Sequence, residues 1–327
     1  MLQPIGKPEV LDPYSIKNLP PLIIGGAVFN YQYSSDPHSL PVQELIERAF
    51  QLGLNALDTS PYYGPSEEII GQALQKISFS RDQYYICTKA GRVQLDEFDY
   101  SRASVRLSVE RSLQRLGTSY IDLVYMHDIE FVEPDQIMDA LKELHLLKSE
   151  GLIKNFGISG YPVKFLYEIA LRCKNEIAPL DAVLSYCNGC IQNTLLFEYH
   201  DKFLQDCGVQ TVLNGSILSM SMLRSDITHS FHPASPALKQ RVADIAEKLK
   251  EENVELADLA TRFAIKEWLF KYKSGIVLGV SNLHELESAV QCYWDVKSGV
   301  LNDGKLVEQV QTSLAEHFNE TWPSGNH

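Results

Sequence analysis

The feature that most constrains the fold of this chain is the regular alternation of short apolar runs with segments of helical periodicity. The eight runs are residues 22–24, 56–58, 84–88, 121–126, 155–158, 182–185, 210–213 and 275–278. Helical stretches lie between most of them. A strand, a helix and a strand repeated in this way predict parallel strands joined by right-handed crossovers. Eight such units close naturally into a (β/α)₈ barrel.

The structural alternative is an open, doubly wound sheet. No G-x-G-x-x-G motif follows the first run, where Gly25 and Gly26 predict only a tight turn, so the open dinucleotide-binding fold is disfavoured. The 327 residues would suggest two average domains, but α/β barrels of this size form one. We therefore predict an α/β protein with a single domain over residues 1–327, its barrel over about 20–295 and a carboxyl-terminal tail over about 296–327.

Two further segments have local predictions. After the second run, apolar residues at 69, 70, 73, 74 and 77 recur at helical spacing, and Ser66 is the predicted N-cap. Residues 214 to about 236, rich in Ser, Met, His and Pro, predict a long loop. Long loops in compact domains are usually functional.

The charge balance excludes some functions. The chain has 42 acidic and 29 basic side chains, a net charge of -13, which disfavours nucleic-acid binding. No apolar run approaches the ~18 residues of a membrane-spanning helix. The first ten residues, MLQPIGKPEV, lack the pattern of a secretory signal. We expect a cytoplasmic protein.

Six cysteines are spread along the chain, and two of them, Cys187 and Cys190, have C-x-x-C spacing. A zinc site would need a second pair of ligands, and a redox pair would need the amino terminus of a helix in a thioredoxin-like unit. Neither is visible in the sequence. We predict two unlinked thiols near a strand end and no metal site.

Polar residues with complementary chemistry follow three neighbouring runs. Asp58, Lys89 and His127 stand at the ends of the second, third and fourth runs, and Tyr63 lies just past the second. In a barrel these strand ends meet at one mouth. Each residue has an ordinary structural alternative: a cap, packing, or a satisfied core residue. Together they can transfer a proton, because a nearby ammonium lowers the pKa of a phenol and an imidazole can orient the substrate oxygen.

The segment D-T-S-P-Y-Y-G-P-S-E at 58–67 resembles the signature of the aldo-keto reductases. The similarity continues through 88–89, 122–127 and 153–159. The resemblance implies a (β/α)₈ barrel that binds an extended nicotinamide dinucleotide without a Rossmann domain. It also implies a catalytic tetrad of Asp58, Tyr63, Lys89 and His127, in which Tyr63 transfers the proton and acts as general base during dehydrogenation.

Residues 127–131, 156–162, 184–188 and 216–220 resemble the sugar-dehydrogenase branch of that family, fungal D-arabinose and plant L-galactose dehydrogenases. The resemblance implies oxidation of C1 of an aldose of the D-arabinose, L-galactose or L-fucose type to the lactone, with hydride transfer to NAD. Two alternatives remain open at this point. One is an NADPH-dependent aldehyde reductase, and the other is a non-catalytic, cofactor-binding regulatory subunit.

The sequence also departs from the family pattern around the cofactor. Ser159 matches the serine that holds the nicotinamide carboxamide, but Gly160 replaces the usual Asn. Gly215 replaces the aromatic residue that stacks on the nicotinamide. The resemblance places Ser216, Leu218 and Met220 in a loop beside the pyrophosphate.

At the adenosine end, Gly279 and Glu285 stand where NADP-preferring members have Lys and Arg, with Ser281 and Asn282 between them. Residues 275–296 contain no Lys or Arg at all. A carboxylate would repel a 2′-phosphate and could accept hydrogen bonds from free ribose hydroxyls, so we predict NAD over NADP. The alternative is a solvated Glu on a helix face.

The substrate pocket is expected to have aromatic walls. Phe29 and Tyr62, with Tyr31 and Tyr161, are the predicted wall residues, and packing at the rim of the barrel is the alternative role for these rings. Asp128, directly after His127, could hydrogen-bond sugar hydroxyls, and a site built for hydroxyls disfavours apolar carbonyl compounds. A cap or a salt bridge is the alternative role for Asp128.

Overall fold

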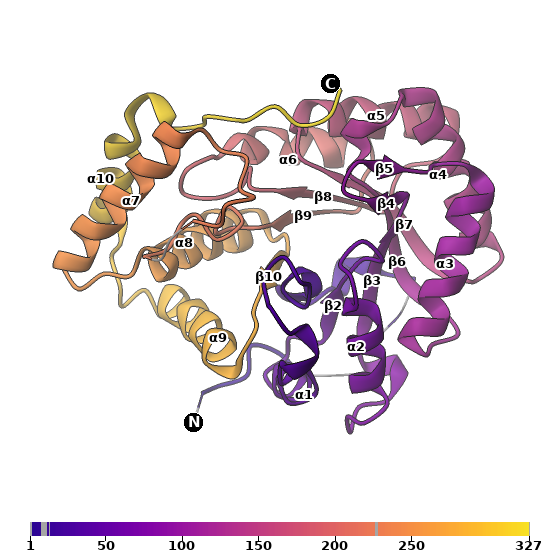
Figure 1. Ribbon diagram of the computed structural model, residues 1–327, viewed down its shortest axis with the longest axis horizontal. Coiled ribbons are helices and arrows are strands. Elements are labelled where there is room, and N and C mark those ends of the chain that lie inside the picture. Colours follow the sequence, from indigo (N-terminus) through magenta and orange to yellow (C-terminus); the bar gives the residue numbers. More distant parts are fainter. Residues whose placement is uncertain (1, 8–11, 13, 226–227, 327) are drawn as a thin grey trace.

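The computed structural model describes residues 2–7, 12, 14–225 and 228–326. Its centre is a closed barrel of eight parallel strands in the order β1-β10-β9-β8-β7-β6-β3-β2 (Figure 1). The strands are β1 Leu22–Gly25, β2 Ala56–Asp58, β3 Tyr85–Ala90, β6 Ile121–His127, β7 Ile153–Gly160, β8 Ala182–Tyr186, β9 Thr211–Gly215 and β10 Ile276–Gly279. Each corresponds to one predicted run, so the predicted (β/α)₈ fold is confirmed.

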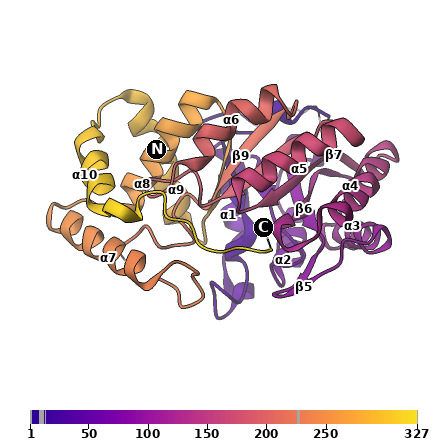
Figure 2. The same cartoon turned by 90° about the horizontal axis from the view of Figure 1, so that it is seen from above.

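Helices surround the barrel, as Figures 1 and 2 show. They are α1 Val42–Gln51, α2 Ser66–Leu74, α3 Arg102–Leu116, α4 Pro134–Ser149, α5 Val163–Glu176, α6 Leu195–Gln205, α7 Pro236–Glu251, α8 Leu256–Ala264, α9 Leu283–Ser298 and α10 Gly304–Leu314. A π-helical segment, Ile265–Phe270, continues α8. Among the described residues, no helix is long and apolar enough to cross a membrane.

The hydrophobic core has an inner and an outer layer. Inward-facing side chains such as Ile23, Leu123 and Leu213 fill the barrel, and alternate strand residues pack outward against the helices. A further buried cluster lies under α7, α8 and α10 and includes Cys187 and Cys190. Both cysteines are buried free thiols that follow β8, as predicted.

The structure contains two features that the sequence did not predict and corrects one prediction. A two-stranded hairpin, β4 Arg92–Gln94 and β5 Glu97–Phe98, follows β3 and was not predicted. The predicted tail contains a helix, α10. Ser66 is not the N-cap of α2, because Pro65 holds that position. The Ser66 hydroxyl instead bonds Thr59 Oγ1 at 2.8 Å and the Gly26 carbonyl at 2.9 Å, where it supports the loops that follow β1 and β2.

The last residues of the chain form a strap across the carboxyl ends of the strands. The strap, residues 318–326, runs back from α10 in yellow in Figures 1 and 2. Trp322 stacks on Tyr161 with ring centroids 4.6 Å apart, and the Asn326 amide donates to the Glu130 carbonyl at 2.8 Å. The strap therefore covers the mouth of the barrel next to β6 and β7.

Candidate active site

The carboxyl ends of the strands present one inward-facing layer of residues. Side chains alternate along a strand, so Asp58, Lys89 and His127 share the inward direction of Ala56, Cys87 and Tyr125, which lie in the barrel interior. Register places Ser159 beside His127 and Gly215 beside Tyr186. The predicted residues from β2, β3, β6 and β7 therefore meet at one mouth.

A buried ion pair joins two members of the predicted tetrad. Lys89 Nζ donates to Asp58 Oδ1 at 2.5 Å and to the Thr59 carbonyl at 2.9 Å. Burial by itself lowers the pKa of Lys89, but Asp58 and Tyr63 together outweigh that effect and the pKa is raised. Lys89 therefore stays a cation in the interior. Asp58 Oδ2 has no hydrogen-bond partner among the described residues.

Tyr63 lies against this cation. Lys89 Nζ is 4.9 Å from the centroid of the Tyr63 ring. Burial raises the pKa of Tyr63 to about 12, and the Lys89 ammonium opposes that rise. The phenol therefore keeps its proton at neutral pH unless additional positive charge is bound nearby. This environment suits a group that exchanges a proton during a reaction.

His127 faces Tyr63 across the mouth. The two rings meet edge to face with centroids 5.6 Å apart. His127 Nδ1 is 3.0 Å from the Ser60 hydroxyl oxygen. The same oxygen accepts a hydrogen bond from the Tyr62 amide at 3.1 Å. Burial, with smaller contributions from Lys89 and Arg92, holds the pKa of His127 well below its usual value. The imidazole is therefore neutral at physiological pH.

An arginine that sequence reasoning missed completes this side of the mouth. Arg92, at the start of the β4–β5 hairpin, forms an ion pair with Asp128 Oδ2, and its guanidinium lies 4.1 Å from the centroid of the Tyr62 ring. The salt-bridge alternative for Asp128 is thus observed. Arg92 is two residues past the end of β3, so the rule that found Lys89 could also have found it.

The predicted pocket walls have different outcomes. Tyr62 is half-buried at the mouth, where its ring meets His127 with centroids 5.8 Å apart. Phe29 follows a 3₁₀ turn at Gly26–Val28 and is fully buried in the outer core layer. Because the turn directs the Phe29 ring beneath the helices, the prediction that it lines the pocket is wrong for this structure.

A buried carboxyl explains one departure from the family pattern. Glu130 Oε1 accepts hydrogen bonds from the Tyr161 amide and the Ser324 hydroxyl, each at 3.0 Å, and Oε2 has no partner among the described residues. A Cβ atom added at Gly160 would overlap Glu130 Oε2. The usual Asn at this position would therefore require the Glu130 carboxyl to move. Burial, with Asp128 adding to it, raises the pKa of Glu130 to about 8.

The loop predicted to lie beside the pyrophosphate leaves β9 at the mouth. Ser216, Leu218 and Met220 are half-buried and alternate with buried Ile217 and Ser219. His232 Nε2 contacts the Ser219 carbonyl at 2.8 Å and fixes the far part of the loop to the near part. Residues 226 and 227 of the predicted 214–236 loop lie outside the described residues.

Glu285 belongs to a helix-capping arrangement at the start of α9. Its carboxylate accepts hydrogen bonds from the Ser281 amide at 2.7 Å and the Ser281 hydroxyl at 3.0 Å, while its own amide donates to Asn282 Oδ1 at 2.9 Å. The residue remains exposed next to Gly279. Thus the Glu285 carboxylate is held by hydrogen bonds at the start of α9, and no ion pair with a cation is found for it among the described residues.

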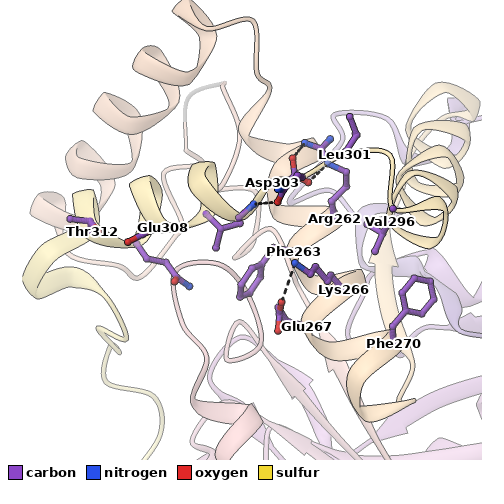
Figure 3. A pocket seen from close by; sticks show the side chains of 15 residues that line it. Arg262, Phe263, Lys266, Glu267, Phe270, Val296, Leu301, Asp303, Glu308 and Thr312 are labelled. Atoms are coloured by element: carbon purple, nitrogen blue, oxygen red, sulfur yellow. Dashed lines mark hydrogen bonds and ion pairs between the residues drawn. The ribbon is translucent and has the colours of Figure 1, made fainter.

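A separate groove of about 830 Å³ lies on the outside of the barrel (Figure 3). It lies between α8 and its π-helical continuation, the end of α9, and α10. Arg262 pairs with Asp303 at 2.7 Å along one wall. None of the predicted site residues lines this groove. In the described part of the chain, no group of three or more His, Cys, Asp or Glu side chains could hold a metal ion.

Comparison with known proteins gives one consistent result. The aldo/keto reductase family matches residues 21–297. D-arabinose 1-dehydrogenase of Saccharomyces cerevisiae is 50% identical over 327 aligned residues, 97% of each chain. L-galactose dehydrogenase of Arabidopsis thaliana is 33% identical over 86% of each chain. An aldo-keto reductase structure from Bacillus halodurans, 21% identical, superposes with a TM-score of 0.66 over 90% of this chain and 91% of the other.

This chain therefore belongs to the aldo/keto reductase family and is an oxidoreductase. Enzymes of this family use a nicotinamide cofactor. The residues present fit such a group: the inward-facing positions at the ends of β9, β10 and β1 are Gly215, Gly279 and Gly25. These three neighbouring strands thus carry no side chain at the level of the tetrad, which leaves room for a flat ring beside it.

Proposed function

We propose that this protein oxidises C1 of an aldose, of the D-arabinose, L-galactose or L-fucose type, to the lactone with NAD as hydride acceptor. The observation that carries the proposal is the buried arrangement in which Lys89, held by Asp58 at 2.5 Å, lies against Tyr63 while neutral His127 faces the same phenol. The names of the relatives from yeast and Arabidopsis support the sugar substrate.

In the proposed reaction the C1 hydroxyl loses its proton to Tyr63 and C1 loses a hydride, so that the lactone carbonyl forms. The nicotinamide ring of NAD, when bound, accepts the hydride. The Lys89 ammonium stabilises the Tyr63 phenolate that must take the proton. Asp58 holds the ammonium in place, and His127 orients the C1 oxygen. Ser159, Ser216, Leu218 and Met220, together with the start of α9, would hold the dinucleotide.

The polarity of the mouth supports a polyol substrate. Arg92 and Asp128 place a cation and a carboxylate beside His127, with the Tyr62 ring against the guanidinium. Sugar hydroxyls can both donate to the carboxylate and accept from the guanidinium. An apolar aldehyde would make neither of these hydrogen bonds with the ion pair. This arrangement favours aldose oxidation over the general aldehyde reductase.

The preference for NAD rests on charge at the adenosine end. Residues 275–296 contribute no Lys or Arg, and exposed Glu285 adds a negative charge. Arg48 reaches α9 from α1, but it pairs with Glu287 at 2.7 Å. A 2′-phosphate would therefore meet a carboxylate and no unpaired base among these residues. The free cysteines also support the proposed cytoplasmic location, since thiols persist in reducing compartments.

The decisive experiment is a matrix of aldoses against NAD and NADP, followed by the increase in absorbance of the reduced nicotinamide. We expect turnover with D-arabinose, L-galactose or L-fucose and NAD, and lactone as product. A preference for NADPH and simple aldehydes would instead support the reductase. Cofactor binding without turnover of any sugar or aldehyde would support the regulatory subunit.

A second experiment tests the role of Glu285 in cofactor choice. We expect Glu285→Arg to increase the ratio of kcat/KM for NADP to that for NAD by about 10-fold or more, because repulsion of the phosphate becomes attraction. Glu285→Gln is the matched control: it keeps a hydrogen-bond acceptor for Ser281 and removes only the charge, so it should give a smaller change in the same direction. A wild-type enzyme that already prefers NADP would contradict the proposal.

A further inference from the structure

The hydroxyl of Ser60 has two hydrogen-bond partners that together determine where its proton lies. Ser60 is fully buried in the turn after β2. The Tyr62 backbone amide lies 3.1 Å from Ser60 Oγ and can only donate, so the oxygen accepts that bond. A hydroxyl has one proton to give. Its other partner among the described residues is His127 Nδ1 at 3.0 Å, so the proton points to that nitrogen.

The opposite arrangement leaves a polar hydrogen without a partner. If His127 Nδ1 carried the ring proton, both His127 Nδ1 and the Tyr62 amide would donate to Ser60 Oγ. The proton of the Ser60 hydroxyl would then be buried without an acceptor in the described structure. Burying an unsatisfied donor is costly enough to disfavour this arrangement by about tenfold or more. Nδ1 is therefore an acceptor, and the single proton of the neutral ring is on Nε2.

The surroundings of Nε2 leave its proton available. Asp128 Oδ2 is 3.5 Å from His127 Nε2, which is longer than an ordinary hydrogen bond, and Arg92 pairs with the same oxygen. The imidazole thus has one nitrogen bonded to Ser60 and one N–H at the mouth that makes no short hydrogen bond to Asp128.

We propose that Ser60 is a positioning residue that holds His127 in the Nε2–H tautomer, so that the ring donates a hydrogen bond to the C1 oxygen of the substrate. The inference rests on the proposed function. In the other tautomer, Nε2 would be an acceptor and would draw the C1 hydroxyl proton away from Tyr63. Ser60 therefore acts through His127, and its effect is on the orientation of the proton that Tyr63 must take.

The first test is the ¹⁵N NMR spectrum of the wild-type protein, with the His127 signals assigned by their loss in His127→Gln. We expect Nε2 to have the shift of a protonated, pyrrole-type nitrogen and Nδ1 that of an unprotonated one. A proton on Nδ1 would overturn the proposal. This measurement needs no turnover, so it tests the tautomer even if no aldose is oxidised. The absence of aldose oxidation would contradict the proposed function and not the assignment of the tautomer.

The second test is Ser60→Ala. We expect the two ¹⁵N shifts of His127 to move toward each other as the tautomers mix, and kcat to fall about 10-fold while KM and cofactor affinity change less than about twofold. Wild-type shifts with full kcat in this variant would overturn the proposal. If the variant does not fold, the wild-type spectrum still decides.

The chain offers a matched control at the other end of the barrel. Ser274 makes the same kind of bond to another buried histidine, with Oγ 3.0 Å from His200 Nε2. Ser274→Ala removes a serine–histidine hydrogen bond of equal length from a ring that we place outside the reaction. We expect the His200 shifts to change and kcat to stay at the wild-type value.

Discussion

The two ends of the barrel bury the same kinds of polar side chain and bond them differently. Asp181, at the amino end of β8, accepts hydrogen bonds from Phe156 N at 3.0 Å, Lys148 Nζ at 2.5 Å and Gln210 Nε2 at 2.6 Å, and both of its carboxylate oxygens are used. Asp58, at the carboxyl end of β2, is equally buried at 3% exposure. Its Oδ2 has no hydrogen-bond partner among the described residues.

The histidines show the same contrast. His200 has partners on both nitrogens, Asp201 at 2.8 Å and Ser274 at 3.0 Å. His127 has Ser60 at 3.0 Å on one nitrogen and only a distant carboxylate at 3.5 Å on the other. A buried polar group usually satisfies its hydrogen bonds within the protein. Complete bonding at the amino end stabilises the fold, and incomplete bonding at the carboxyl end leaves groups available to a ligand.

The largest effect should come from removing the phenol hydroxyl at the carboxyl end. We expect Tyr63→Phe to lower kcat by about 10²–10⁴-fold, the usual contribution of a positioned acid or base. The melting temperature and the affinity for NAD should change little, because the ring and its contact with Lys89 remain. Steady-state kinetics with calorimetry checks both. Near-normal turnover would remove Tyr63 from the mechanism and would erase the contrast between the two ends.

The next effect concerns the incompletely bonded carboxyl of Glu130. Its pKa of about 8 in the folded protein is above its unfolded value, so the folded state binds the proton more tightly and stability falls as pH rises from about 4.5 through 8. Each unit of difference costs about 1.4 kcal/mol. We expect Glu130→Gln to remove this loss and to be more stable than wild type at pH 9, as measured by denaturant unfolding.

Glu143→Gln is the control for that experiment. Glu143 accepts from Arg102 at 2.9 Å and Arg106 at 2.8 Å, so its loss should not stabilise the protein at pH 9. A Glu130→Gln variant that shows the wild-type dependence of stability on pH would contradict the assignment.

The smallest effect on activity should come from the amino end. We expect Asp181→Ala to lower the free energy of unfolding by about 1–3 kcal/mol, because it leaves a buried backbone amide without its acceptor. The kcat/KM of the folded variant should stay within about twofold of wild type. A large loss of activity without a loss of stability would show that the two ends do not have separate roles.

The fold and the predicted tetrad could be read from the sequence because both depend on local, periodic signals. Apolar runs of strand length define the eight barrel strands, and the polar residues at the end of each run lie at the mouth whatever the conformation of the loops. Asp58, Lys89 and His127 were found by that rule. The residues proposed to hold the cofactor at the start of α9 followed from the resemblance to the family, and the capping role of Glu285 was not predicted.

The roles of the missed residues depend on tertiary contacts that leave no local pattern. Arg92 reaches Asp128 only because a short hairpin turns back over the mouth. Ser60 matters through a bond to a residue 67 positions away. Phe29 was misplaced because one 3₁₀ turn decides whether the ring lies in the pocket or under the helices. The strap over Glu130 comes from the tail, which shows no strand-helix repeat.

The overlap between Gly160 and Glu130 also restricts the order in which this site can evolve. A side chain at 160 requires the Glu130 carboxyl to move, since a Cβ would overlap Oε2. A shorter residue at 130, by contrast, is sterically compatible with the present glycine. A lineage that acquires a side chain at 160 must therefore displace the Glu130 carboxyl, unless residue 130 has changed first. Reconstructed intermediates along the two orders would differ in stability although their endpoints are the same.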